Sequence, residues 1–291
     1  MLWCNKKALR KLAFSMTLIY SLGIAAPFFV LAAPDADEEP NLSTYEAYGC
    51  LSPRPLTYAH RAIINGLSEN SILAIASCLE NESVEGIEID ARKCKNAIVL
   101  HHDETIYIDG EEFKISDLTH EELPTIPTLA TILDFYDGSK PLIIDIKGNA
   151  KESTAIVYEI NAMLENYPHT HNIHLQSRYP KVLRQIKTLN PNYNTVLLIC
   201  DYKDIKNITN APAFDTFNIK YSLVNKRVAY LLRRIKKPVI LWGTIEKATD
   251  CSYALYLLDD LPTVLLTDHS TTLFDNLNSA TEMQRLLVQS E

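Results

Sequence analysis

The chain is poor in positive charge, which excludes one class of partner. It has 28 Lys and Arg residues against 36 Asp and Glu residues, so its formal net charge is −8 at pH 7. Proteins that bind nucleic acids without sequence preference depend on Lys and Arg to neutralise phosphates. We therefore expect no nucleic-acid partner, and any positive charge that handles an anion must be local.

Cysteine is present, but not in a metal-binding spacing. The six cysteines include no Cys-x-x-Cys pair, which excludes the common thiolate zinc patterns. Cys4 lies in an N-terminal segment that we expect to be removed, and the five others are an odd number. An exported chain would therefore keep at least one unpaired thiol, and the spacing leaves the pairing of the rest open.

The first 32 residues resemble a secretory signal peptide. Four basic residues precede an apolar stretch from Leu12 to Ala33 that ends in small residues, and cleavage after Ala32 fits this pattern. Its loss takes the net charge from −8 to −12 and leaves 33–50 as an acidic linker. We expect a secreted or periplasmic protein. The alternative is an uncleaved membrane anchor, because the apolar stretch is about as long as a spanning helix.

Residues 51–291 alternate between strand-length apolar runs and helix-length amphipathic segments. The predicted strands are Leu56–His60, Gly86–Asp90, Ala97–His101, Leu142–Ile146, Asn172–Gln176, Thr195–Cys200, Thr216–Ile219, Val239–Trp242 and Thr263–Leu266. The predicted helices are Glu69–Glu80, Thr128–Tyr136, Ser153–Asn166, Pro180–Leu189, Lys226–Ile235, Glu246–Leu258 and Thr271–Leu287. Such alternation predicts a parallel sheet with helical crossovers. The number of strands favours a single (β/α)8 TIM barrel, whose active site would lie at the C-terminal strand ends.

Three carboxylates occupy predicted strands at a spacing that puts them on one face. Residues at i and i+2 of a strand share a face, so Glu88 and Asp90 point one way and their apolar neighbours the other. The same rule places Asp145 together with Lys147. In a barrel the apolar face packs under the helices. We therefore expect the three acids to converge inside the barrel.

Converging buried carboxylates require a cation, because burial and mutual repulsion both oppose their ionised forms. A hard divalent ion meets this need, and ligation entirely by oxygen suits Ca²⁺ or Mg²⁺. The predicted metal ligands are Glu88, Asp90 and Asp145.

Histidines and cations follow the same strands. His60 closes the first strand and His102 follows the third, which suits them as the acid/base pair of a phosphoryl transfer. Arg61 and Lys147 would hold the nonbridging phosphate oxygens, one as a planar fork and the other as a point charge. This set predicts metal-assisted attack on a phosphodiester.

Short motifs covering almost the whole mature chain occur in the order and approximate spacing of a known family. They are Ala59-His60-Arg61, Glu69-Asn70-Ser71, Gly86–Asp90, His102–Thr105, Leu118–Leu123, Ile126–Leu129 and Ile144–Lys147, with weaker matches at Gln176-Ser177, Leu241-Trp242 and Leu266–Asp268. In these motifs the chain resembles the glycerophosphodiester phosphodiesterase family.

The resemblance implies a TIM barrel, a divalent cation and hydrolysis of glycerophosphodiesters to glycerol 3-phosphate and an alcohol. It implies the same acid/base, metal and phosphate roles for the residues named above. It also implies that Trp242 lines the substrate pocket, although a Trp after an apolar strand is equally often a core residue. Glu69 has two interpretations: a site residue, or a first-turn Glu favoured by the helix dipole.

The chain departs from the family pattern at several positions. Ala62 stands where Gly is usual, and Asp145 where Glu is usual. Ile106–Gly110 replaces an Arg-Thr-Thr segment. Arg178 follows Ser177 where the family tends to have an aromatic residue, and His269-Ser270 stands where it tends to have a Pro. The catalytic residues are retained, but the substrate remains open.

Two other functions stay possible for the same barrel. One is a sphingomyelinase D-like or lysophospholipase D-like enzyme that acts on choline phospholipids; these enzymes resemble this chain in being secreted and in using Asp as the third ligand. The other is a secreted binding protein that has lost turnover. In either case we expect a small-molecule or lipid-derived phosphodiester as ligand. Membrane contact would arise only through that lipid or an uncleaved leader.

Overall fold

The structure is a computed structural model that describes residues 54–289, apart from the side chains of 210–212 and 280–289. The predicted signal peptide (1–32) and linker (33–50) lie outside the described residues, as do 51–53 and 290–291 of the predicted barrel domain. Among the described residues, no helix is both long enough and apolar enough to cross a membrane.

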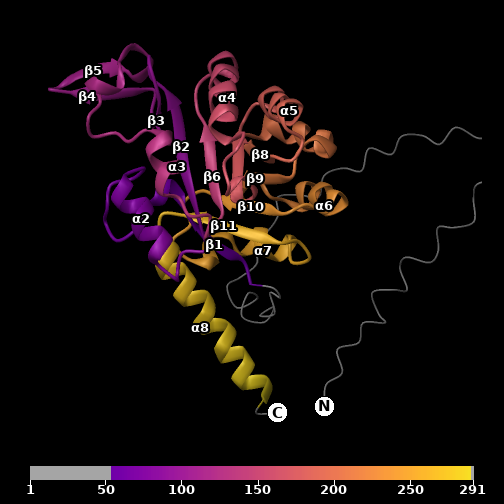
Figure 1. Cartoon of the computed structure of the whole chain (residues 1–291). Coiled ribbons are helices and arrows are strands. Elements are labelled where there is room, and N and C mark those ends of the chain that lie inside the picture. The colour runs from indigo at the N-terminus through magenta and orange to yellow at the C-terminus, as the bar shows by residue number, and fades with distance from the viewer. Residues whose placement is uncertain (1–53, 290–291) are drawn as a thin grey trace, which may run out of the picture. The chain divides into compact units, whose positions relative to one another are not determined.

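Eight parallel strands of the described chain close into a barrel (Figure 1). In order around the ring they are β1 (Leu56–Ala59), β2 (Gly86–Lys93), β6 (Leu142–Ile146), β7 (Ile173–Ser177), β8 (Asn194–Ile199), β9 (Thr216–Lys220), β10 (Val239–Trp242) and β11 (Thr263–Thr267). The pair β1–β2, with Tyr58 opposite Gly86, completes the circle. The predicted (β/α)8 fold is therefore confirmed.

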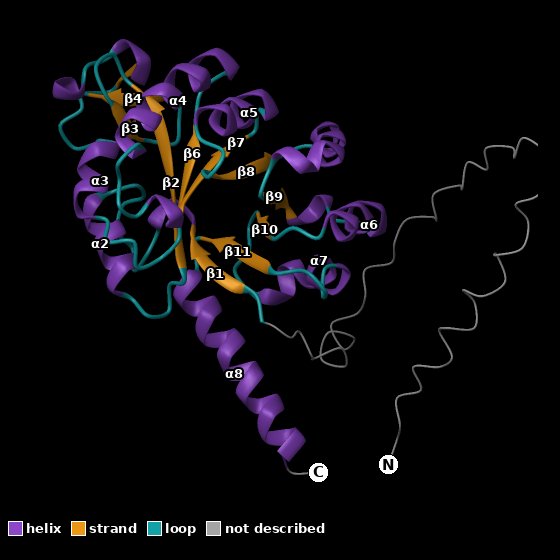
Figure 2. Cartoon of the chain, turned by 45° about the vertical axis from the view of Figure 1, so that its right-hand side comes forward, coloured by secondary structure: helices purple, strands orange, loops and turns teal. Residues whose placement is uncertain are grey.

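Figure 2 shows the helices as an outer ring around the strands. They are α2 (Ile72–Glu80), α3 (Leu129–Phe135), α4 (Ala150–Leu164), α5 (Pro180–Leu189), α6 (Lys226–Ile235), α7 (Ser252–Leu257) and α8 (Ser270–Gln289). The main core includes buried strand residues such as Ile87, Ile89 and Ile144. A separate cluster of Tyr58, Ile143, Val196, Ile240 and Leu266 packs together. Because these side chains fill the inside of the barrel, it has a packed floor beneath its mouth, the C-terminal ends of the strands.

The prediction that Ala97–His101 forms a barrel strand is wrong. The segment forms β3 (Ile98–Leu100), which pairs antiparallel with the far end of β2, Ala91 lying opposite Leu100. β2 has eight residues and extends past its neighbours, so the chain can turn back on it. An apolar run indicates that a strand forms, but it does not indicate the direction of the strand. The eight parallel strands close the barrel without β3.

A second hairpin, β4 (Thr105–Ile108) with β5 (Glu111–Lys114), was not predicted from the sequence. Its turn is Asp109-Gly110, and both residues have positive φ angles, 52° and 86°. Asp-Gly is a common turn pair of tight hairpins, because both positions tolerate that backbone conformation. The sequence signal was therefore present in the segment that replaces Arg-Thr-Thr.

Most predicted helices form close to their expected bounds, with two differences. The helix predicted over Glu69–Glu80 begins only at Ile72, because Asn70 has a left-handed φ of 54° and the Ser71 side chain accepts a hydrogen bond from the Ala74 amide at 3.2 Å. The segment predicted as Glu246–Leu258 divides into a 3₁₀ turn (Ala248–Cys251) and α7.

One close approach on the ring gives a stability prediction. A β carbon on Gly86 would lie 2.5 Å from the Tyr58 ring, and that ring is buried. We expect Gly86→Ala to lower the free energy of unfolding by about 1–3 kcal/mol, because the added carbon overpacks the site. Denaturant unfolding measures this change.

The double variant Tyr58→Leu/Gly86→Ala serves as its control. Removing the ring relieves the clash, so the two losses should sum to more than the loss in the double variant. If the losses of the two single variants add up to the loss in the double variant, the close approach of residue 86 to the Tyr58 ring would be contradicted.

Candidate active site

Three carboxylates meet inside the barrel. Asp90 of β2 lies opposite Asp145 of β6 in the strand register, and Glu88 is two residues before Asp90 on the same face. Their exposed fractions are 2% for Glu88, 0% for Asp90 and 3% for Asp145. One ligand oxygen of each lies within 4.8 Å of those of the others, so the trio forms a group that could hold a metal ion. The expected convergence is confirmed.

Lys147 lies between two of these acids. Its Nζ is 2.8 Å from Asp90 Oδ1 and 2.5 Å from Asp145 Oδ2. Burial alone would lower the pKa of Lys147, but the surrounding carboxylates outweigh it and raise that pKa. Burial likewise opposes ionisation of Asp90, yet Lys147 and a hydrogen bond from Asn70 lower the pKa of Asp90. The Asp-x-Lys spacing therefore builds an ion pair into the site.

Glu88 is an acid of the cluster whose ionised form is disfavoured. Burial, followed by repulsion from Asp90, raises the pKa of Glu88 to about 8. Glu88 Oε2 also accepts a hydrogen bond from the Arg61 amide at 2.9 Å. Three acids and one ammonium group leave a deficit of positive charge, and the donors are all carboxylate oxygens. The residues therefore fit a hard divalent cation such as Ca²⁺ or Mg²⁺.

Asn70 positions Asp90, a role that was not predicted. Its Nδ2 donates to Asp90 Oδ2 at 2.8 Å, and its Oδ1 accepts from the Asp90 amide at 2.9 Å. The side chain is buried, and the Asn70 amide donates to the Arg61 carbonyl at 2.8 Å. Asn tolerates the left-handed backbone better than most residues, which was the available sequence signal.

The turn after β1 is held in an unusual backbone conformation. Arg61 and Ala62 have φ angles of 52° and 56°, in the left-handed region. This conformation costs an L-residue roughly 1–2 kcal/mol, and Ala62 is fully buried. The Ala found where the family has Gly is thus accommodated in a conformation that Gly adopts more easily.

Glu69 belongs to the site through Arg61. Arg61 Nη1 donates to both Glu69 oxygens, at 3.1 and 3.3 Å, and Arg61 Nε is 3.8 Å from Asp90 Oδ2. Glu69 precedes the N-cap Ser71, so it is not a first-turn residue of α2. The helix-dipole interpretation is therefore wrong.

Each candidate catalytic histidine has an aspartate on the same ring nitrogen. Nδ1 of His60 is 2.7 Å from Asp268, and Nδ1 of His102 is 2.7 Å from Asp103. Each pairing leaves Nε2 as the other ring nitrogen. Burial acts to lower the pKa of both histidines. At His60, Asp268 and Glu88 outweigh burial, so the pKa of His60 is raised. At His102, the charge of Lys147 adds to burial, so the pKa of His102 is lowered. Both aspartates stand in motifs quoted above, but their roles were not predicted.

A cavity of about 600 Å³ joins these groups. Seven predicted site residues line it: His60, Arg61, Glu88, His102, Asp145, Lys147 and Trp242. Trp242 is therefore a pocket residue, and its Nε1 donates to the Ile199 carbonyl at 3.3 Å. Asn218 and Gln176, which are buried and share a 2.7 Å hydrogen bond, also line the cavity.

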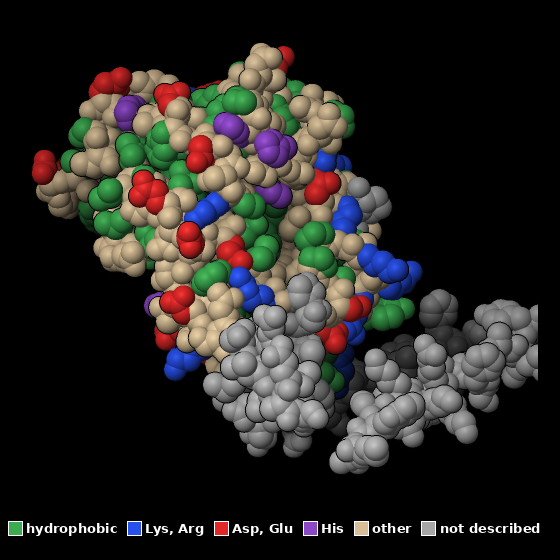
Figure 3. Space-filling view, turned by 60° about the horizontal axis from the view of Figure 1, so that its bottom comes forward, with side chains coloured by type: hydrophobic (Ala, Val, Ile, Leu, Met, Phe, Trp, Pro, Cys, Tyr) green, Lys and Arg blue, Asp and Glu red, His purple; other side chains and the backbone are tan. Residues whose placement is uncertain are grey.

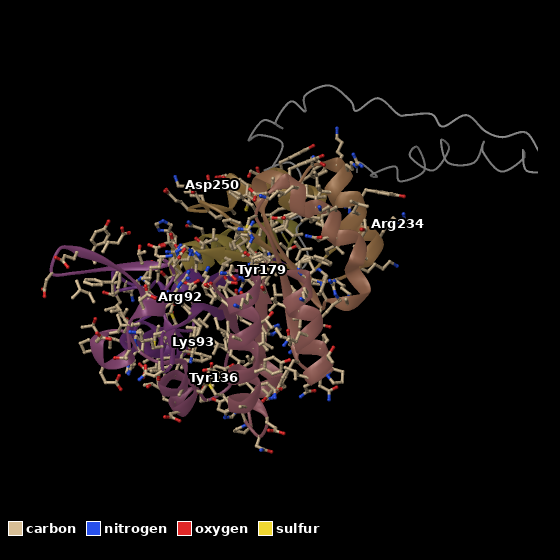
Figure 4. All side chains as sticks on the ribbon, turned by 90° about the horizontal axis from the view of Figure 1, so that it is seen from above. Arg92, Lys93, Tyr136, Tyr179, Arg234 and Asp250 are labelled. Atoms are coloured by element: carbon tan, nitrogen blue, oxygen red, sulfur yellow. The ribbon has the colours of Figure 1, made fainter. Side chains whose placement is uncertain are left out.

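Three further residues at the cavity edge were not predicted to belong to the site. Arg178 pairs with Asp201 at 3.4 Å, and Arg92 Nη2 donates to the His102 carbonyl at 2.7 Å. Figure 4 labels Arg92 and Tyr179, which line the cavity and lie in the middle of the view, whereas Arg234 of α6 lies at the outer edge.

The opposite side of the molecule carries other histidines. Several His side chains gather on the face seen from below in Figure 3, among acidic, basic and hydrophobic ones. Among the described side chains, however, Glu88, Asp90 and Asp145 form the one group of His, Cys, Asp or Glu residues that could hold a metal ion.

The described cysteines, Cys78, Cys94, Cys200 and Cys251, are all free thiols.

No family model and no curated protein matches the chain, but solved structures do. A glycerophosphodiester phosphodiesterase from Parabacteroides distasonis gives a TM-score of 0.64 at 17% identity, over 78% of this chain and 98% of that one. A glycerophosphodiester phosphodiesterase from Agrobacterium tumefaciens gives a TM-score of 0.60 at 14% identity, over 78% of this chain and 100% of that one. A phosphodiesterase from Oleispira antarctica in complex with the product sn-glycerol-3-phosphate gives a TM-score of 0.65 at 16% identity, over 78% of this chain and 97% of that one. At these identities the likeness establishes the fold alone.

Lys147 gives a stability prediction for the site. Removing its ammonium with Lys147→Met leaves buried carboxylates uncompensated, so we expect a loss of about 3–5 kcal/mol in the metal-free protein at pH 8. Carboxylates with raised pKa values bind protons more tightly in the folded state, so the deficit should shrink as the pH falls toward 5. Denaturant unfolding at several pH values measures both effects.

Lys151→Met, on the exposed first turn of α4, is the control and should change stability little. Equal stability of Lys147→Met and the unsubstituted protein would contradict the assigned charge balance.

Proposed function

We propose that this protein is a metal-dependent phosphoric diester hydrolase that cleaves glycerophosphodiesters into glycerol 3-phosphate and an alcohol. The observation that carries the proposal is a single cavity lined by two acids of the trio, a lysine and two histidines, each histidine paired with an aspartate. The fold shared with glycerophosphodiester phosphodiesterases supports it. So does the glycerol 3-phosphate in the Oleispira antarctica structure.

Glu88, Asp90 and Asp145 would hold the divalent ion, Ca²⁺ or Mg²⁺. When bound, such an ion supplies Lewis acidity toward phosphoryl oxygens and balances the charge of the trio. Asn70 would keep Asp90 in its ligand orientation, since it occupies one oxygen and the amide of that residue. Partners of this kind commonly change metal affinity by 10–100-fold when they are removed.

Lys147 and Arg61 would bind the nonbridging phosphate oxygens. Lys147 presents a point charge between Asp90 and Asp145 of the trio. The Arg61 guanidinium is oriented by Glu69, which accepts from one terminal nitrogen. Both cations therefore stand close to the acids, where a phosphate shared with the ion would lie. This arrangement supports the proposed orientation of the phosphodiester.

The two histidines would perform the proton transfers. With Nδ1 directed at an aspartate, each ring presents Nε2 for proton transfer, in the tautomer that its aspartate selects. In hydrolysis one ring takes the proton of the attacking water, and the other gives a proton to the departing alcohol oxygen. Asp268 and Asp103 act as positioning residues, because they orient the rings without touching the reacting atoms.

Export is part of the proposal. The signal-peptide pattern of residues 1–32 supports a secreted or periplasmic location, in which the substrate would be met outside the cytoplasm. The binding-protein alternative predicts the same fold and location without turnover, so a kinetic test separates the two.

We expect His60→Asn and His102→Asn each to lower kcat by at least about 10²-fold, because each removes one proton transfer. Release of glycerol 3-phosphate from glycerophosphoethanolamine measures turnover, and denaturant unfolding verifies that the variants fold. His171→Asn, on an exposed side chain before β7, is the matched control and should keep full activity.

Removal of the divalent ion is the second arm of this experiment. Chelation should abolish turnover, and added Ca²⁺ or Mg²⁺ should restore it. A protein that hydrolyses no glycerophosphodiester with either ion, or that keeps near-normal rates in either histidine variant, would refute the proposed function.

A further inference from the structure

A second cavity, of about 250 Å³, adjoins the main one. His60, Trp242 and Leu266 line both, so the two cavities are lobes of one mouth that meet at these side chains. The second lobe is completed by residues from the ends of β9, β10 and β11, among them Lys220, Thr244, Asp268 and His269. A phosphodiester joins two alcohol groups, its two arms, to one phosphate. If the bridging oxygen of one arm faces His60, the rest of that arm can extend into the second lobe.

The position of Lys220 is set by the strands. Asn218 lines the main cavity, and Lys220, two residues further along β9, falls on the same face. In the parallel register Lys220 lies opposite Trp242 of β10. The next residue, Gly243, has a φ of 137°, and a β carbon there would lie 2.8 Å from the Tyr221 ring and 3.8 Å from Lys220 Cγ. Close packing of the two strand ends therefore holds Lys220 beside the indole.

Lys220 brings a positive charge that no acid of the described chain pairs with. Its Nζ lies 5.9 Å from the centre of the Trp242 ring. No ion pair among the described side chains involves it, and the acid of the lobe, Asp268, is bonded to His60 at 2.7 Å. In a chain of net charge −8 this is a local positive site facing a cavity.

The same contact disfavours one substrate class. A choline or other quaternary ammonium group binds best over the face of an aromatic ring, and Trp is the best ring for this purpose. In this lobe the Lys220 ammonium already lies over the Trp242 face. A cationic arm would meet like charge there, and an anionic arm would meet opposite charge.

We propose that the second lobe receives the alcohol arm of the substrate and that Lys220 selects alcohols that carry a carboxylate. A carboxylate is favoured over a phosphate because the chain as a whole is strongly acidic and repels a dianion more than a monoanion. The inference rests on the proposed function, since it takes the trio and the histidines as the place where the phosphodiester is held. Lys220 is thereby a specificity-determining residue.

Two substrates that differ by one carboxylate test this inference. Glycerophosphoserine and glycerophosphoethanolamine share the glycerol, the phosphate and the amine. We expect the protein to favour the serine ester by about tenfold in kcat/KM, a typical size for one partly screened charge contact. Lys220→Gln should bring the ratio close to one, and Lys220→Glu should invert it.

Lys236→Gln is the matched control, because Lys236 is an exposed lysine just before β10, at the end of the barrel away from the mouth. This variant should leave the ratio unchanged. A ratio near one in the unsubstituted protein, or a preference that survives Lys220→Gln, would overturn the inference.

A binding measurement keeps this test independent of turnover. Calorimetric titration with phosphoserine and phosphoethanolamine, in the presence of Ca²⁺ or Mg²⁺, compares the same two arms without hydrolysis. Tighter binding of phosphoserine that is lost in Lys220→Gln supports the inference even if no diester is cleaved, in which case the proposed function alone fails. Equal affinities for the two esters, or no binding of either at millimolar concentration, would count against the second lobe as a carboxylate subsite.

Discussion

Three buried carboxylates share a single ammonium group at the centre of this barrel, and the rest of the site depends on that imbalance of charge. Lys147 lies between Asp90 and Asp145 and, together with Asn70, lowers the pKa of Asp90. At Glu88, burial and repulsion from Asp90 outweigh the neighbouring cations and raise the pKa to about 8. A divalent cation would restore the balance. The polar contacts of the site therefore hold the carboxylate oxygens of the three acids close to one another.

The barrel makes this concentration of charge possible. Strand alternation turns Glu88 and Asp90 inward while Ile87 and Ile89 enter the core beneath the helices, so the cost of burying acids is offset by adjoining apolar packing. The cluster of Tyr58, Ile143, Val196, Ile240 and Leu266 fills the inside of the barrel. The charged side chains are thereby concentrated at the mouth, where loops from many strands can contribute side chains.

The parts of the site that follow from period-two alternation could be predicted from the sequence. Glu88 with Asp90, and Asp145 with Lys147, needed only the rule that i and i+2 share a face. Partners that are distant in the chain could not be found in this way: Asp268 is 208 residues from His60, and only closure of the ring brings them together. Local backbone conformation was the other limit. The left-handed Asn70 delayed the start of the expected helix to Ile72, and Glu69, which lies outside that helix, pairs with Arg61.

The departures from the family pattern concentrate around the mouth. Ala62 is accommodated at the strained turn, and Arg178 is held by Asp201 at the cavity edge. Apart from these departures, Lys220 places a cation beside Trp242. The acidic trio and the histidines stand in the motifs that carry the resemblance, whereas the cavity edge has its own charge pattern. This division supports common phosphodiester chemistry with a distinct preference for the alcohol.

The central claim is that the trio binds one divalent ion, and Mn²⁺ titration of the chelator-treated protein, followed by electron paramagnetic resonance, tests it most directly. The account predicts one bound ion per chain, displaced by Ca²⁺ or Mg²⁺, and at least a 10²-fold loss of affinity in Asp90→Asn, which keeps the side-chain volume but removes a charged ligand. No bound Mn²⁺, or binding that Asp90→Asn leaves unchanged, would contradict it.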